Sequence, residues 1–305
     1  MRPAWSIIFF TSSSGLGLGL AAWIVLGFLD LSDPASLIGV GLLTLGLIGA
    51  GLLSSTFHLG HPERAWRALT QWRSSWLSRE GVLAVLVMAA LAGWFANLYF
   101  NGAMLAMWAN VVIVVLIALT VYATSMIYAS LKTVARWHHP LTPICYLMFA
   151  AAGGLLAILW LMAVLGQVIN AAMVQATLVL MASAWGVKIA WWRVAGNSAS
   201  ASTAETATGL GSFGKVRSLM PPHTSENYLQ HEMGFKVARR HATKLRTIAL
   251  SLGAALPLIL VAVAPTSAVM LGLALMSHVI GVFVERWLFF AEAKHVVTIY
   301  YGDTA

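Results

Sequence analysis

Two polar stretches between apolar segments carry side chains that could exchange protons with a substrate held in a membrane. Residues 57–67 read FHLGHPERAWR, and residues 78–81 read SREG. Histidine titrates near neutral pH, and a partly desolvated glutamate can be tuned toward the same range. Quinone chemistry needs such groups, because each two-electron step moves two protons and the carbonyl oxygens need a donor or acceptor within reach. The two stretches therefore predict a proton-exchanging quinone pocket at a membrane edge.

Glu80 has a second interpretation, because it opens an apolar segment. A carboxylate near a helix N-terminus is stabilised by the helix dipole by about 0.3–1 kcal/mol. Glu80 could then serve as a helix cap and nothing more. The residue types alone leave both roles open.

His278 lies about midway along another apolar segment, where an ionisable side chain is costly and is by default a functional candidate. A haem would need a second histidine on a facing helix, and only His58 comes near that depth. His58 thus keeps the haem question open, but we favour a hydrogen bond between helices for His278 over a haem b ligand. The single cysteine, Cys145, forms no intrachain disulfide and no cysteine cluster, and we predict no metal site.

The elements that position these residues follow from the composition. The chain has 305 residues, of which 60% are hydrophobic and 9% are charged, whereas a soluble domain has about 25% charged residues. Mean hydropathy is +0.83. These values exclude a soluble enzyme, a disordered protein and a secreted disulfide scaffold. They predict an all-α polytopic membrane protein, with residues 1–305 forming a single integral-membrane domain.

A transmembrane helix needs about 20 mostly apolar residues, and the sequence predicts eight such helices. They are Trp5–Leu29, Leu37–Phe57, Glu80–Phe100, Ala103–Tyr128, Pro143–Leu165, Gln167–Trp192, Thr247–Ala264 and Ser267–Phe290.

All 18 Lys and Arg residues fall on one side of this topology. Sixteen of them occupy the ends of the chain and the longer connections 58–79, 129–142 and 193–246, and the short connections have none. The other two, Lys188 and Arg286, lie in the last turns of the predicted spans that end on the same side. The positive-inside rule then predicts cytoplasmic termini and long connections, although any one charge could simply meet anionic lipid headgroups. The connection 193–246 is predicted to be a cytoplasmic loop, flexible over 196–214, with a short amphipathic helix within 223–246. The net charge of +8 sets topology, and we expect no nucleic-acid partner.

Three stretches resemble the DmsC family, the membrane anchor subunits of molybdoenzymes of the DMSO-reductase superfamily. They are residues 55–65 (STFHLGHPERA), 78–80 (SRE) and 285–295 (ERWLFFAEAKH). The resemblance implies a three-part complex. A catalytic subunit would hold a molybdenum cofactor, an electron-transfer subunit would hold [4Fe–4S] clusters, and the anchor would bind a quinone without haem.

The resemblance also implies roles for individual residues. His58 and Glu80 match family positions linked to quinol binding, and Arg64 matches a family arginine in the same loop. We add the neighbouring His61, Arg79 and Trp66 to this predicted pocket. A partner-docking surface is predicted from Arg67, Arg73, Arg136, Glu292 and His295. Glu285 and Arg286 could form interface ion pairs or join that surface.

The charge map selects a branch of the family. The His-Leu-Gly loop at 58–60 lies on the side that carries every Lys and Arg, which predicts a cytoplasmic docking face in a bacterial inner membrane. Respiratory DMSO reductases have exported catalytic subunits, so the chain more closely resembles the anchor of a cytoplasmic sulfite dehydrogenase that reduces ubiquinone or menaquinone.

Two alternatives stay open. The first is a quinol-oxidising anchor of an S-oxide reductase. The second is a membrane transporter, which should show polar or broken segments at the midplane, where only His278 qualifies. No chain of polar groups across the membrane is evident from the sequence, so we expect one-sided proton chemistry.

Overall fold

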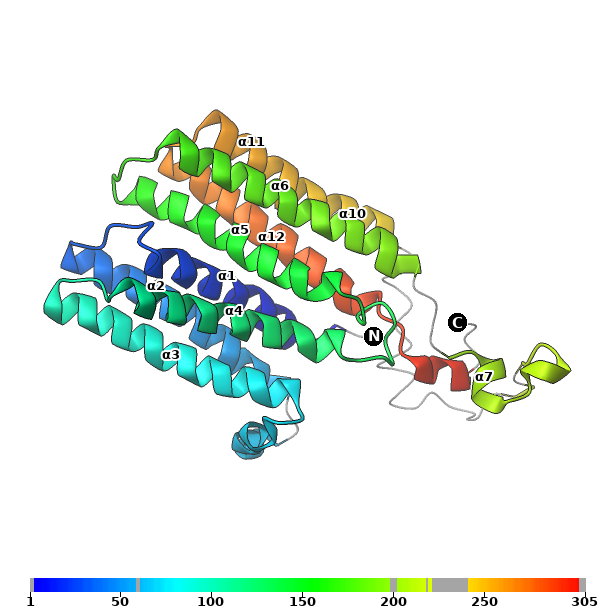
Figure 1. The fold of residues 1–305 in the computed structure, drawn as a ribbon. Helices are drawn as coiled ribbons and strands as arrows, with labels where there is room; N and C mark the ends of the chain where they lie inside the picture. Colours follow the sequence, from blue (N-terminus) through cyan, green and yellow to red (C-terminus); the bar gives the residue numbers. More distant parts are fainter. Residues whose placement is uncertain (1–2, 59–60, 198–201, 218, 221–240, 302–305) are drawn as a thin grey trace.

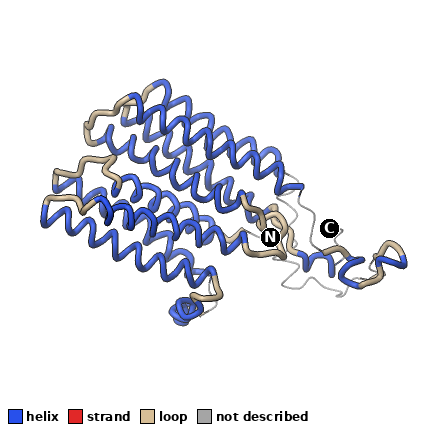
Figure 2. The backbone as a smooth tube through the Cα atoms, in the orientation of Figure 1, coloured by secondary structure: helices blue, strands red, loops and turns tan. Residues whose placement is uncertain are grey.

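The computed structural model describes residues 3–58, 61–197, 202–217, 219–220 and 241–301. Within these residues the backbone forms only helices and loops (Figure 2). Eight helical segments are long and apolar enough to cross a membrane, which confirms the predicted all-α polytopic fold. They are α1 (Trp5–Val25), α2 (Pro34–Ser54), α3 (Trp76–Asn101), α4 (Met107–Ala129), α5 (Leu141–Val164), α6 (Ala171–Val194), the α10–α11 segment (Ala242–Val263) and α12 (Ala268–Ala291).

Most span boundaries differ by a few residues from the sequence prediction, and two of these differences have clear local reasons. The first helix ends at Val25, since the chain reverses at Gly27, whose φ of 84° suits glycine. The third begins four residues before Glu80, because the Ser75 side chain caps the helix by accepting a hydrogen bond from the backbone N–H of Ser78. A helix dipole acts most strongly on the first turn of the helix, and Glu80 lies beyond that turn. The cap interpretation of Glu80 is wrong.

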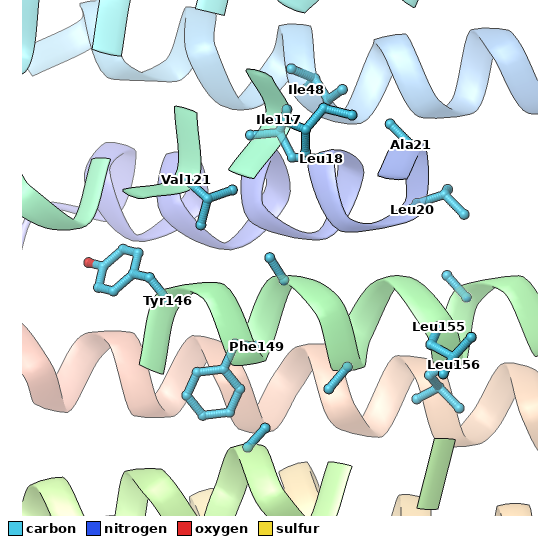
Figure 3. Close-up of a cluster of buried hydrophobic side chains, with 14 of the residues drawn as sticks. Leu18, Leu20, Ala21, Ile48, Ile117, Val121, Tyr146, Phe149, Leu155 and Leu156 are labelled. Atoms are coloured by element: carbon cyan, nitrogen blue, oxygen red, sulfur yellow. The ribbon is translucent and has the colours of Figure 1, made fainter. Parts of the chain in front are cut away.

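The spans form two groups of four that meet along one interface, called the seam below. Helices α1 to α4 pack together, as do α5, α6, α10–α11 and α12 (Figure 1). Contacts of α5 with α1 and α4, and of α12 with α1, join the two groups. Since α1 and α5 lie at this seam, they are the most buried spans. Within the first group, Leu18, Ile48 and Ile117 converge from three helices (Figure 3).

The long connections and both described ends of the chain lie at one end of the bundle, called the charged end (Figure 1). The fully described connections at the other end, 26–33, 102–106, 165–170 and 264–267, contain no Lys or Arg. After α6, the described part of the connection holds three short elements, η3 (Ala195–Asn197), α7 (Ala204–Thr208) and η4 (Gly211–Phe213). The amphipathic helix predicted within 223–246 falls largely on 221–240, outside the described residues, and 242–246 begin α10 (Ala242–Leu250).

Glycines bring α1 and α5 into direct backbone contact at the seam. A Cβ added at Gly19 would overlap the carbonyl oxygen of Ala150, and one added at Gly154 would overlap the backbone of Gly19. Small residues permit such close approach between membrane helices. The seam position of α5 therefore depends on the absence of a side chain at these glycines.

We expect Gly154→Ala to destabilise the folded protein by about 1–3 kcal/mol, the usual cost of overpacking. The measurement is the thermal unfolding midpoint of the purified protein in detergent. Gly93→Ala is the matched control, since an added Cβ at Gly93 meets no atom within 4 Å. Equal midpoints for the two variants would contradict the close packing of α1 against α5.

The seventh span contains a π-helical turn that supplies carbonyl oxygens to α12. This turn, η5 (Ser251–Ala255), separates α10 from α11 (Leu256–Val263). A π-turn shifts the backbone hydrogen bonds of its helix. Here, Ser277 Oγ donates to Leu252 O at 2.6 Å, and His278 Nδ1 lies 2.7 Å from Gly253 O. The interhelical hydrogen bond predicted for His278 is thus present.

Candidate functional site

The connection between α2 and α3 carries most of the predicted pocket residues, and it lies at the charged end. It holds two 3-10 segments, η1 (Ser55–His58) and η2 (Pro62–Gln71). The side chain of His58 is outside the described part of the structure, so its predicted role stays a prediction.

The other predicted members on this connection face solvent. His61 Nδ1 lies 3.0 Å from Glu63 Oε1, and Arg64 Nε lies 3.7 Å from the same oxygen, with all three side chains more than half exposed. Trp66 is exposed beneath the guanidinium of Arg67. Among the described residues, no hydrogen bond or ion pair joins this surface cluster to Glu80.

Glu80 is buried on α3, with 5% of its surface exposed. The hydroxyl of Thr124 on α4 donates a hydrogen bond to Glu80 Oε1. A carboxyl buried with one hydroxyl partner is poorly solvated, and a proton bound there neutralises its charge. The arrangement suits a group that accepts and releases a proton beside the membrane core.

An apolar groove of about 390 Å³ opens between α3 and α4. Its lining includes Arg79 and Ala123, the chain neighbours of Glu80 and Thr124, but neither Glu80 nor Thr124 themselves. Ligand pockets usually enclose roughly 300–1,000 Å³. Trp76 and Tyr122 form an edge-to-face pair in its wall, with ring centroids 5.8 Å apart. The groove is lined by Trp72, Trp76, Arg79, Val82, Leu83, Leu119, Tyr122 and Ala123.

Arg79 is fixed at this groove by backbone and ring contacts. Its Nε donates to Trp72 O at 2.9 Å, and its Nη2 donates to Arg73 O at 2.7 Å. The guanidinium lies 4.3 Å from the centre of the Trp76 ring. Of the predicted pocket residues, the structure thus brings Glu80 and Arg79 to one region and leaves His61, Arg64 and Trp66 on the surface.

A buried ionic cluster, which the sequence interpretation missed, lies on α6 and α12. Lys188 pairs with Glu285, and Arg286 Nη1 lies 3.4 Å from the other carboxylate oxygen of Glu285. All three side chains are at most 3% exposed. Lys188 Nζ also lies 3.6 Å from the centre of the Trp191 ring. Glu285 and Arg286 are therefore inside the bundle and not at a docking surface.

The helical spacing of α12 could have revealed this cluster. His278, Gly281 and Glu285 are separated by three and four residues, so they share one helix face. All three are buried. A face that holds a midplane histidine and a close-packed glycine points into the bundle, and Glu285 points there too.

Glu292 holds three segments together at the charged end. Its Oε2 lies 3.0 Å from Arg136 Nη2 in an ion pair, and its Oε1 accepts a hydrogen bond from Arg246 Nη2 at 2.8 Å. The side chain is only 2% exposed. Burial lowers the pKa of Arg136, and the charge of Glu292 opposes that shift. Of the predicted docking residues, Arg67 and Arg73 are exposed, whereas Glu292 is occupied by this internal pair.

His295 follows α12 and is partly buried, and this burial lowers the pKa of its imidazole. Its Nδ1 accepts a hydrogen bond from the backbone N–H of Val297 at 3.1 Å. Its docking role stays a prediction.

Comparison with known proteins decides the family. Residues 1–292 match the family described as DMSO reductase anchor subunit (DmsC). The chain belongs to the DmsC family. It is 32% identical to the C subunit of the sulfite dehydrogenase of Allochromatium vinosum, with both proteins covered in full. It is 29% identical to the C polypeptide of the anaerobic dimethyl sulfoxide reductase of Haemophilus influenzae, over 49% of this chain and 55% of that protein.

Membership of the DmsC family identifies the protein as a membrane anchor subunit of complexes of the DMSO-reductase type. Its eight candidate membrane spans agree with an anchor. In this DmsC-family protein, Glu80 is a buried acid on α3, and the groove at Arg79 is an apolar surface between α3 and α4.

Proposed function

We propose that this protein is the quinone-binding anchor of a molybdenum and iron–sulfur complex that passes electrons from sulfite to the quinone pool. The observation that carries the proposal is the buried Glu80, hydrogen-bonded by Thr124, on the same two helices that line an aromatic groove. Full-length similarity to the C subunit of a sulfite dehydrogenase supports the choice of substrate.

Electrons and protons balance across the proposed complex. At the catalytic partner, sulfite and water give sulfate, two protons and two electrons. The iron–sulfur partner passes both electrons to the anchor, where one quinone takes them up with two protons to become a quinol. Glu80 supplies a proton to a quinone oxygen and is reprotonated from the charged end, as expected of a general acid.

The groove would hold the quinone ring, either ubiquinone or menaquinone. Trp76 and Tyr122 offer flat apolar surfaces, and Leu83 and Leu119 extend the wall toward the membrane interior. Two backbone carbonyls and the Trp76 ring fix the position of the Arg79 guanidinium, so its positive charge lies at the groove. A positive charge there favours electron entry into a quinone, since reduction adds negative charge before protons arrive.

We place the charged end in the cytoplasm of a bacterium, with the anchor in the inner membrane. The support is the restriction of Lys and Arg to that end. The iron–sulfur partner would dock on the same face, where Arg67 and Arg73 are exposed. Electron transfer from this partner then ends at the membrane edge, close to Glu80.

Cysteine labelling tests this orientation. In intact cells, a membrane-impermeant maleimide should modify Asn101→Cys at the opposite end, and should modify Arg67→Cys only after permeabilisation. The native Cys145 is 2% exposed and should give little background. The reverse pattern would place the docking face outside the cytoplasm.

The function itself is tested on the complex purified with its partner subunits. We expect sulfite-dependent reduction of a short-chain quinone. The second candidate, oxidation of quinol by an S-oxide reductase, is favoured by the half-length similarity to the C polypeptide of a dimethyl sulfoxide reductase. S-oxide-dependent quinol oxidation without sulfite activity would select that candidate and overturn the first.

A further inference from the structure

A small cavity lies within the seam, enclosed by α1, α4, α5 and α12. Its volume is about 40 Å³. One buried water needs roughly 10–15 Å³ of such space, so the cavity has room for a few water molecules and is too small for a quinone ring. Polar side chains in its wall come from all four helices and include Ser12, Thr124, Tyr146, His278 and Arg286.

Three of these polar groups have no hydrogen-bond partner among the described residues. They are the hydroxyls of Ser12 and Tyr146 and the Nε of Arg286. All three side chains are more than nine-tenths buried. Buried polar groups in native proteins are almost always hydrogen-bonded, to protein or to ordered water. Figure 3 shows Tyr146 and Phe149 on α5, with the Phe149 ring on the side of α5 away from α1.

The cavity extends from the middle of the bundle toward the charged end. His278 Nδ1 is occupied by Gly253 O, and its Nε2 lies next to Gly153, where an added Cβ would be 3.5 Å away. Arg286 follows His278 by eight residues on the same helix, or about 12 Å at 1.5 Å per residue. Water bound between these two residues would extend, along the membrane normal, through roughly the inner part of one membrane leaflet.

Thr124 connects this cavity to the acid of the proposed quinone site. Its hydroxyl belongs to the cavity wall and donates to Glu80 Oε1. A hydroxyl has one proton to donate and two lone pairs that accept. Thr124 can therefore accept a hydrogen bond from a cavity water while it donates to Glu80.

The charges around the cavity orient such waters. Arg286 presents a fixed positive charge, and Glu285 lies behind it, paired also with Lys188. These three charges sum to a net positive charge. Waters bound beside Arg286 would turn their oxygen atoms toward it and their protons away from it, toward the rest of the cavity wall.

We propose that this cavity holds a water cluster that delivers protons to Glu80 through Thr124, with Ser12, Tyr146 and Arg286 as positioning residues. Proton delivery toward a quinone rests on the proposed function. The presence of water in the cavity does not depend on it. In each transfer, a water proton bonds to Thr124 Oγ as the former Thr124 proton passes to the Glu80 carboxylate. The hydroxide left behind takes a proton from the next water, and the last water of the cluster takes one from a hydronium ion that enters from the charged end, so charge and atoms balance.

Hydration is tested first, without turnover, by X-ray hydroxyl-radical labelling of the intact complex. Radicals formed from bound water modify side chains next to it even when they are buried. Phe149 and Tyr146 should be labelled several times faster than Phe289, a buried aromatic residue outside the cavity wall. Filling the cavity by Ser12→Val should bring the Phe149 rate down to that of Phe289. Equal rates in the wild type would overturn the inference.

Proton delivery is tested by Tyr146→Phe, with Tyr99→Phe at the opposite end of the bundle as the matched control. Loss of the Tyr146 hydroxyl should lower kcat for quinone reduction roughly tenfold, with a larger solvent isotope effect and an unchanged KM for quinone. Unchanged kcat and isotope effect, with Phe149 labelled, would refute the relay. A wild-type complex that reduces no quinone refutes the proposed function instead, and the labelling rates then decide hydration alone.

Discussion

Glu80→Gln should lower quinone-linked turnover about 100- to 1,000-fold while the complex assembles at wild-type levels. Glutamine has nearly the same size, and its carbonyl oxygen can still accept the hydrogen bond from Thr124. It cannot give up a proton as a carboxylic acid does, and a positioned general acid typically contributes about 10²- to 10⁴-fold. The measurement is sulfite-dependent quinone reduction per assembled complex.

Glu63→Gln is the matched control, because it removes an exposed carboxylate from the same end of the bundle. It should leave turnover unchanged. The rate of sulfite oxidation with an artificial acceptor that takes electrons directly from the catalytic partner should be the same in all variants. His58→Ala should also slow quinone-linked turnover without loss of assembly. Normal rates for both Glu80→Gln and His58→Ala, at wild-type levels of complex, would remove this site from consideration.

Glu285→Leu should destabilise the protein by about 3–5 kcal/mol, the usual cost of removing one partner of a buried ion pair. The variant leaves Lys188 and Arg286 as two buried positive charges with no carboxylate between them. The expected results are a strongly lowered thermal midpoint in detergent and reduced amounts in the membrane. Glu292→Gln should cost less, because its partners Arg136 and Arg246 are partly exposed to solvent.

A second substitution should restore much of the lost stability. The double variant Lys188→Met with Glu285→Leu removes one charge of each sign, so the cluster keeps the net charge of the wild type, now on Arg286 alone. Replacing a buried ion pair with neutral groups of similar volume is often tolerated. A double variant no more stable than Glu285→Leu would show that the cluster acts through its shape and not through charge balance.

The sequence was sufficient for features that depend on composition and periodicity. The eight spans, the segregation of Lys and Arg and the family all follow from residue types and short motifs. The ends of the first and third spans did not, because Gly27 and Ser75 set them through local backbone geometry.

Partners from different helices were beyond the sequence prediction. The contact of Glu80 with Thr124 depends on the rotation of α3 against α4, and that of Lys188 with Glu285 depends on α6 against α12. Each residue taken alone has several plausible surroundings. Glu285 was misplaced because charges near the end of a span usually reach the interface, and here a close-packed helix face holds it inside.

The seam between the two groups of helices has a consequence for how the protein is made. Ribosomal synthesis delivers α1 to α4 before α5 to α12, and the N-terminal part of a chain generally folds first. Until α5 and α12 arrive, Ser12 and Thr124 face the bilayer with no polar wall opposite them. Nascent chains that end after the fourth span should therefore be retained by insertases or degraded, and the second half of the protein completes insertion of the first.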